Sequence, residues 1–185
     1  AGEISAAITI NPSDLALHDQ LGDLYAGQKL YARAVERYGM ILKIDPRRAR
    51  TRFQMAKALL ANGQGKEAVT NLKQTLSADP RFLEAANQLA RVLASHPDKT
   101  LRSPREAIAL TMRLCQTPGK KNPRFLDTHA TAAAALGNFE LAVQSAEQAL
   151  ALYKADARFA ASVKPLENRL TLFREKQAWV ETEWK

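Results

Sequence analysis

The chain is built from helical segments that recur at a nearly fixed interval. Apolar residues lie three or four positions apart along most of it, the spacing that places them on one face of a helix. Pro12, Pro46 and Pro80 are evenly spaced, and each follows an asparagine or an aspartate. Alanines mark a second position of nearly the same period: Ala34, Ala68, Ala107 and Ala142. This pattern predicts helical hairpins joined in series.

Each hairpin carries a bulky residue followed by a small one on its first helix. The first reads Leu21-Gly22-x-x-Tyr25, then Tyr31, Ala34, Tyr38 and Pro46, and it resembles the tetratricopeptide repeat (TPR) motif. The later hairpins keep the motif more loosely, with Met55-Ala56, Leu89-Ala90 and His129-Ala130. The resemblance covers about residues 13–153. It implies an all-α, right-handed solenoid in which each hairpin buries its apolar face against its neighbours.

The repeat period also sets the expected boundaries. Residues 1–12 are predicted to be the end of a truncated preceding repeat, and residues 13–154 to hold four repeats. Residues 155–185 are expected to form a C-terminal capping helix and a tail. The four repeats are predicted at 13–48, 49–82, 83–122 and 123–154.

The third repeat departs from the period. It carries extra residues around His96–Thr100, and Ser103 and Glu106 are expected to form a capping box at the start of its second helix. In the fourth repeat, His129 replaces the usual leucine, which predicts looser or more polar packing against the third. His18 and His129 are expected to face the core.

The C-terminal segment shows one amphipathic stripe. Phe159, Val163, Leu166, Leu170 and Phe173 recur at helical spacing, so residues 156–178 are predicted to form a single capping helix. Pro165 is expected to kink or restart it. The tail 181–185 is expected to be frayed.

Composition narrows the possible chemistry. The chain has one cysteine, Cys115, which excludes an internal disulfide and a multi-cysteine metal site; we expect it to be buried on an apolar helix face. No apolar run approaches the roughly 20 residues that span a bilayer. The residues indicate no cofactor and no compartment.

The net charge of +8 is concentrated in two short segments. Residues 47–57 carry five bases and no acid, and residues 99–124 carry seven bases and one acid, whereas the rest of the chain is nearly neutral. Hairpin geometry places several of these bases in turns at one edge of the solenoid, and this predicted basic edge consists of Arg47, Arg48, Arg81, Lys120 and Lys121. Its role is either solvation or docking to an acidic partner. Nucleic acid is disfavoured, because aromatic residues do not interleave with the bases.

The TPR resemblance implies that the first helices line a concave face. Carried over residue by residue, it predicts a peptide-binding groove from Asp19, Asp23, Arg50, Phe53, Gln54, Lys57, Asn87, Gln88, Arg91, Arg124, Asp127 and Thr131. Amides could pair with a peptide backbone, and Lys57 and Arg91 could flank an acidic side chain. Acids at Asp19 and Asp23 argue against the carboxylate clamp of chaperone-binding members.

No catalytic constellation is visible, so the chain is expected not to be an enzyme. The segment Asn62–Glu67 only superficially resembles a phosphate loop, since Leu60 stands where the first glycine is required. The leading hypothesis is a scaffold that binds a peptide segment of a protein partner in the groove. One alternative is the partner- or substrate-recruiting domain of a larger bacterial membrane or glycosyltransferase-type enzyme. Another is self-assembly through the truncated N-terminal face.

Overall fold

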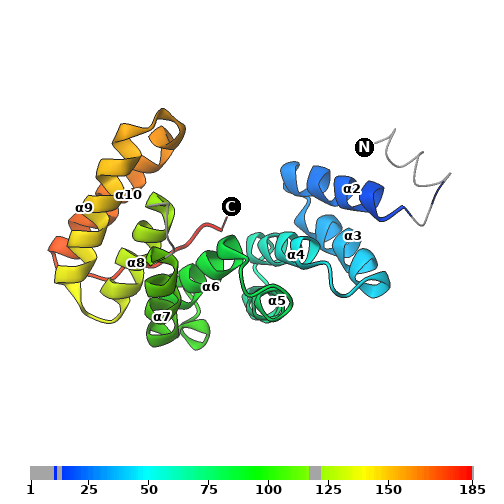
Figure 1. Cartoon of the computed structure of the whole chain (residues 1–185), viewed down its shortest axis with the longest axis horizontal. Coiled ribbons are helices and arrows are strands. Elements are labelled where there is room, and N and C mark those ends of the chain that lie inside the picture. The colour runs from blue at the N-terminus through cyan, green and yellow to red at the C-terminus, as the bar shows by residue number, and fades with distance from the viewer. Residues whose placement is uncertain (1–10, 12–13, 117–121, 185) are drawn as a thin grey trace. The chain divides into compact units, whose positions relative to one another are not determined.

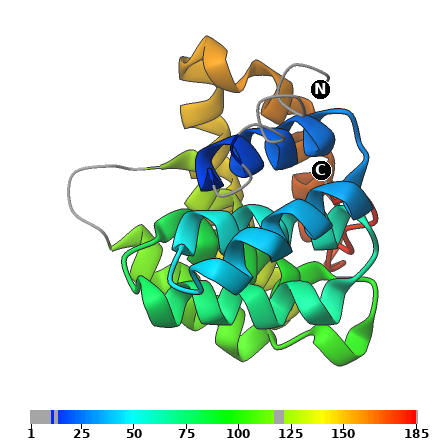
Figure 2. The ribbon, with the colours of Figure 1, turned by 90° about the vertical axis from the view of Figure 1, so that its right-hand side faces the viewer.

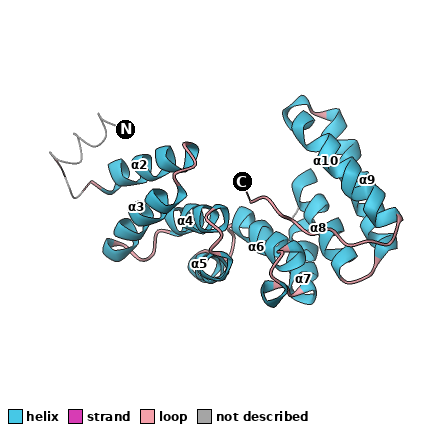
Figure 3. Cartoon of the chain, turned by 180° about the vertical axis from the view of Figure 1, so that it is seen from behind, coloured by secondary structure: helices cyan, strands magenta, loops and turns pink. Residues whose placement is uncertain are grey.

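The computed structural model describes residues 11, 14–116 and 122–184. Within these ranges the chain consists of helices and the turns between them, without a strand (Figure 3). The predicted truncated repeat of residues 1–12 lies almost wholly outside the described residues. None of the described helices is both long enough and apolar enough to span a membrane.

The described chain divides into two compact units. The first consists of the described residues up to Ala85 together with 183–184, and contains α2 (Leu15–Gly27), α3 (Tyr31–Ile44), α4 (Ala49–Ala61), α5 (Gly65–Ala78) and the start of α6 (Leu83–Ser95). The second, residues 86–182, contains the rest of α6, the 3-10 turns η1 (Lys99–Leu101) and η2 (Ala157–Phe159), and the helices α7 (Pro104–Cys115), α8 (Pro123–Ala135), α9 (Phe139–Ala155) and α10 (Ala160–Arg174) (Figure 1).

The core of the first unit depends on a close crossing of α2 and α3. Tyr38 is buried, with 1% of its surface exposed, and its ring lies directly against Gly22. A Cβ atom on Gly22 would stand only 2.5 Å from Cε1 of Tyr38, so the small residue of the repeat motif is required by the ring. Ala34 and Ile41 complete this contact surface with no exposed area.

The core of the second unit joins α8, α9 and α10. Alanines on α8 and α9 let these helices approach closely, and α10 covers them with Leu166, Leu170 and Phe173. The chain reverses between α9 and α10, seen in orange in Figures 1 and 2. The predicted apolar stripe therefore does cap the hairpin.

The capping helix is shorter than predicted. A 3-10 turn precedes it, and it ends at Arg174 rather than near residue 178. Lys176 adopts a φ of 57°, in the left-handed region. The N–H of Gln177 then donates to Leu172 O at 2.8 Å, which closes the helix. Pro165 lies inside α10, which continues through it without interruption.

Two further predictions are wrong. Ser103 caps α7 without a side-chain hydrogen bond, so the expected capping box does not form. Cys115 is exposed rather than buried, because it lies in the last turn of α7, beside the buried Leu114 but off the buried face.

The histidine predictions agree with the structure. His18 and His129 are buried, 8% and 9% exposed. Nδ1 of His129 lies 2.9 Å from Oγ1 of Thr111, which joins α8 to α7 through a buried polar contact. The packing of the third and fourth repeats is thus polar at this position.

This buried histidine predicts an acid sensitivity. Burial lowers the pKa of His129 below its ordinary value of 6.5, so the unfolded chain takes up the proton first as the pH falls. The contribution of neutral His129 to the free energy of unfolding is therefore complete above pH 6.5. It is lost as the pH falls toward the lower pKa that His129 has in the folded chain. We expect His129→Leu to lose less stability than the parent chain between pH 7 and pH 5. Urea midpoints at the two pH values measure this, and equal losses would contradict it.

Candidate functional site

The two acids predicted to line the groove in the first unit are used inside the fold. Asp19 receives hydrogen bonds from Nη2 of Arg48 and Oγ1 of Thr51, both at 2.8 Å. Oδ1 of Asp23 accepts hydrogen bonds from the hydroxyl of Tyr38 at 2.6 Å and from the side-chain amide of Gln54 at 3.3 Å. These contacts tie α2 to α3, α4 and the turn before α4.

The tyrosine in this network is held neutral. Burial, then the hydrogen bond to Asp23, raises the pKa of Tyr38 well above its usual range. Asp19 therefore contacts Arg48 and Thr51, and Asp23 contacts Tyr38 and Gln54, as polar links between helices. Binding of a peptide by these residues stays a prediction.

A second face of α4 remains open. Phe53 is half-buried and packs against Phe82, with ring centroids 5.0 Å apart. Nζ of Lys57 lies 5.8 Å from the Phe53 centroid and 3.4 Å from Oε1 of Gln54. Arg50 and Lys57 are exposed, and neither forms an ion pair with any described residue. The Phe53 ring with Lys57 beside it, and Arg50 one turn earlier on α4, form the accessible part of the predicted site in the first unit.

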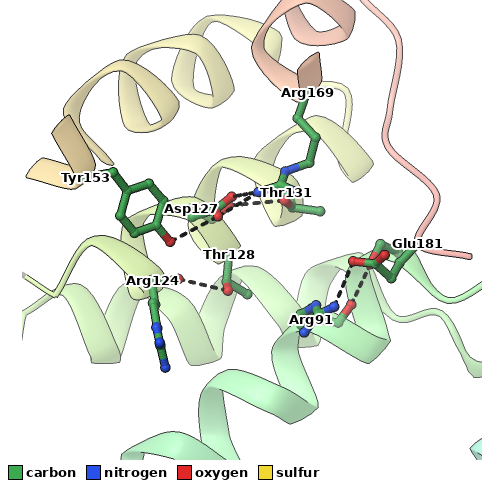
Figure 4. A network of polar contacts seen from close by, with 9 residues as sticks. Arg91, Arg124, Asp127, Thr128, Thr131, Tyr153, Arg169 and Glu181 are labelled. Carbon is green, nitrogen blue, oxygen red and sulfur yellow. Dashed lines mark hydrogen bonds and ion pairs between the residues drawn. The ribbon is translucent and has the colours of Figure 1, made fainter. Parts of the chain in front are cut away.

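The second unit contains a largely buried ion pair between Asp127 on α8 and Arg169 on α10. One guanidinium nitrogen of Arg169, Nη2, lies 2.7 Å from both carboxylate oxygens of Asp127 (Figure 4). The hydroxyl of Tyr153 donates to the same carboxylate at 3.2 Å, and burial raises the pKa of that hydroxyl. Only 14% of the Arg169 side chain and 15% of the Asp127 side chain are exposed. Asp127 was predicted as a groove residue, whereas Arg169 and Tyr153 were not.

Arg91 also has an internal partner that the sequence did not reveal. Its Nη2 lies 2.8 Å from Oε2 of Glu181, which comes from the C-terminal tail (Figure 4). The N–H of Glu181 donates to the carbonyl of Ser95 at 2.8 Å. The tail is therefore held in place at Glu181, and the prediction that residue 181 is frayed is wrong.

Two other predicted residues of the second unit, both on α8, differ in accessibility. Thr131 is buried, 5% exposed, and its hydroxyl donates to Asp127 O, so it cannot contact a peptide as predicted. Arg124 is exposed, with its guanidinium carbon 5.6 Å from the Phe159 centroid. Of the two, only Arg124 is therefore available to a ligand.

The two predicted amides of α6 are partly accessible. Asn87 and Gln88 are half-buried. Oδ1 of Asn87 is buried without a hydrogen-bond partner in the described part of the chain.

Of the five residues of the predicted basic edge, three are described by the structure, and one of these three is committed to an ion pair inside the fold. Arg47 and Arg81 are exposed, and Arg47 lies 4.0 Å from Asp45. Arg48 is committed to Asp19. Lys120 and Lys121 lie outside the described residues.

The accessible groups suit contacts with carboxylates and peptide amides. They are guanidinium and ammonium groups, half-buried amides and an aromatic ring. Within the described ranges, no cluster of three or more histidine, cysteine, aspartate or glutamate side chains could hold a metal ion.

Solved structures with the same fold include three repeat proteins. MamA is 17% identical, with a TM-score of 0.65 over 88% of each chain. TTC0263, a thermophilic TPR protein in Thermus thermophilus, is 18% identical, with a TM-score of 0.66 over 93% of this chain and 87% of that one. PilW, a type IV pilus biogenesis factor, is 20% identical, with a TM-score of 0.66 over 89% of this chain and 76% of that one. No protein-family model matches the sequence, and no curated protein does.

Proposed function

We propose that this chain, which has the tetratricopeptide-repeat fold, is a non-enzymatic interaction module that binds an extended, acidic segment of a protein partner. The single observation that carries the proposal is the open face of α4. The Phe53 ring lies there with the ammonium group of Lys57 5.8 Å from its centroid. Arg50 stands one turn earlier on α4, and neither exposed cation forms an ion pair within the described chain.

The chemistry of this face favours one kind of ligand. Phe53 offers an apolar surface to a partner side chain, and the flanking cations attract a carboxylate. Gln54 can exchange its contact with Asp23 for a peptide amide, since that hydrogen bond is long at 3.3 Å. A segment with an apolar residue next to acids would satisfy all three.

A pull-down with a charge-reversed face tests this function. We expect Phe53→Ala with Lys57→Glu to lose the partners that the parent chain captures, because the aromatic contact and the cation are removed together. Bound proteins from the source lysate, identified by mass spectrometry, are the measurement.

The matched control is Lys66→Glu. It makes the same charge change at an exposed position of α5. Partners kept by Lys66→Glu and lost by the double variant support the proposal. Partners kept by both would rule out the α4 face, and a captured partner without acidic segments would rule out the proposed chemistry.

A further inference from the structure

The C-terminal tail of the second unit has the geometry of a bound peptide. After the left-handed turn at Lys176, residues 177–184 form neither helix nor strand. Trp179 and Glu181 are partly buried, whereas Val180 and Thr182 between and after them are exposed. This alternation is that of an extended segment that presents every second side chain to a surface.

Three kinds of contact hold the tail. The Trp179 side chain packs against the apolar cluster of α8, α9 and α10, and the Arg169 guanidinium carbon lies 5.9 Å from a Trp179 ring centroid. The carboxylate of Glu181 pairs with Arg91, and the Glu181 side chain is only 15% exposed. The backbone N–H of Glu181 donates to the carbonyl of Ser95, the last residue of α6. A carbonyl at the end of a helix accepts no hydrogen bond from within that helix, so it is available to the tail.

The tail meets the residue that the TPR resemblance marked for ligand binding. Its place in the repeat predicts that Arg91 lines the groove. In the structure a glutamate lies there, the acidic side chain that such a cation was expected to receive. The sequence pattern and the geometry therefore lead independently to the same position.

The docking also leaves polar groups unpaired. Nε1 of Trp179 is buried and has no hydrogen-bond partner in the described part of the chain, and neither has Nε of Arg169. Buried donors without acceptors weaken an interaction, so the tail is held less tightly than its contact surface allows. A phenylalanine in place of the tryptophan would keep the apolar contact without the unpaired N–H.

We propose that the segment Gln177–Thr182 is an intramolecular ligand of the second unit, and that it occupies the site of a partner peptide with an aromatic residue two positions before a glutamate. This rests on the proposed function of the chain as an interaction module. The tail and the partner compete for Arg91 and for the apolar surface beside Arg169. The partner binds only to the fraction of molecules whose tail has left.

The chain reports tail release by its own fluorescence. Both of its tryptophans lie after α10: Trp179 is within the proposed ligand segment, and Trp184 lies two residues beyond its end. Tryptophan emission therefore comes from the C-terminal tail alone, and Trp179 reports on the ligand segment itself. We expect Glu181→Arg in the full chain to place two cations together and release the tail, which raises iodide quenching of the emission. Glu175→Arg is the matched control, because it makes the same charge change at an exposed residue at the end of α10.

Peptide binding then tests the competition. The probe is a fluorescein-labelled peptide of residues 176–183 carrying Trp179→Phe, followed by anisotropy. We expect Glu181→Arg to bind this peptide about tenfold more tightly than the parent chain does. The reason is that the tail no longer competes for the site once its charge-assisted hydrogen bond to Arg91 is lost. Glu175→Arg should bind like the parent, and Glu181→Arg combined with Arg91→Glu should lose the gain.

Several results would overturn the inference. A released tail in Glu181→Arg without tighter peptide binding would make the tail a part of the fold only. Unchanged quenching in that variant would show that the ion pair does not hold the tail. Exchange of tails between two copies, seen as a dimer in light scattering of the parent chain, would replace the intramolecular ligand by an intermolecular one. Because the α4-face pull-down does not involve the tail, partner capture there would leave the proposed function standing if the peptide test failed.

Discussion

Asp127→Ala is expected to lower the free energy of unfolding by about 3 kcal/mol, the order found when one partner of a buried ion pair is removed. The loss arises because Arg169 would keep its charge in a surface that is only 14% exposed, with no carboxylate to compensate it. The hydroxyl of Tyr153 would lose its acceptor in the same step. Urea unfolding followed by circular dichroism measures the effect.

An exposed ion pair in the same unit provides the control. Arg174 pairs with Glu147 at 2.8 Å, but the two side chains are 59% and 51% exposed. Glu147→Ala should therefore cost no more than about 0.5 kcal/mol, since water compensates both charges. Equal losses for Glu147→Ala and Asp127→Ala would show that burial of the Asp127 network contributes nothing. The double change Asp127→Leu with Arg169→Met should recover much of the loss, because no buried charge remains.

Gly22→Val is expected to destabilise the first unit by about 3 kcal/mol, the upper end of the usual cost of overpacking a core. A Cβ atom at this position would meet three ring atoms of Tyr38 at 3.0 Å or less. Tyr38 cannot withdraw easily, because it is buried and its hydroxyl is fixed by Asp23. The β-branch adds a helix-propensity cost of its own. Thermal or urea unfolding of the variant is the measurement.

Gly39 in α3 is the matched position. A Cβ atom there would meet nothing within 4 Å. Gly39→Ala should stabilise the chain by about 0.5–1 kcal/mol, the ordinary gain of alanine over glycine inside a helix. If Gly22→Val behaved like Gly39→Ala, the close contact between α2 and Tyr38 would not be a requirement of the fold.

The repeat register could be predicted because it depends on local spacing. The four alanines at the period, Ala34, Ala68, Ala107 and Ala142, all have no exposed surface. A small residue that recurs at one place in each hairpin indicates the point where two helices pack closely against each other. These packing points then determine how the hairpins are arranged in the fold. His18 and His129 followed from the same register.

The contacts at the candidate site could not be predicted in this way. Arg169 lies 42 residues from Asp127 in sequence, and Glu181 lies 90 residues from Arg91. The first pair forms because α10 packs beside α8, and the second because the tail runs past α6. The repeat period of the sequence gives no information about either contact. The end of α10 was misplaced for a related reason, since Lys176 adopts a left-handed conformation that sequence patterns expect of glycine.

The exposed position of Cys115 has a practical consequence for work with this chain. It is the sole cysteine in the sequence, so maleimide chemistry attaches one dye or spin label at one known place, the last turn of α7. For the same reason, any disulfide-linked dimer formed during storage must run through Cys115. Measurements of self-association therefore need a reducing agent or Cys115→Ser, so that an oxidation product is not taken for a biological assembly.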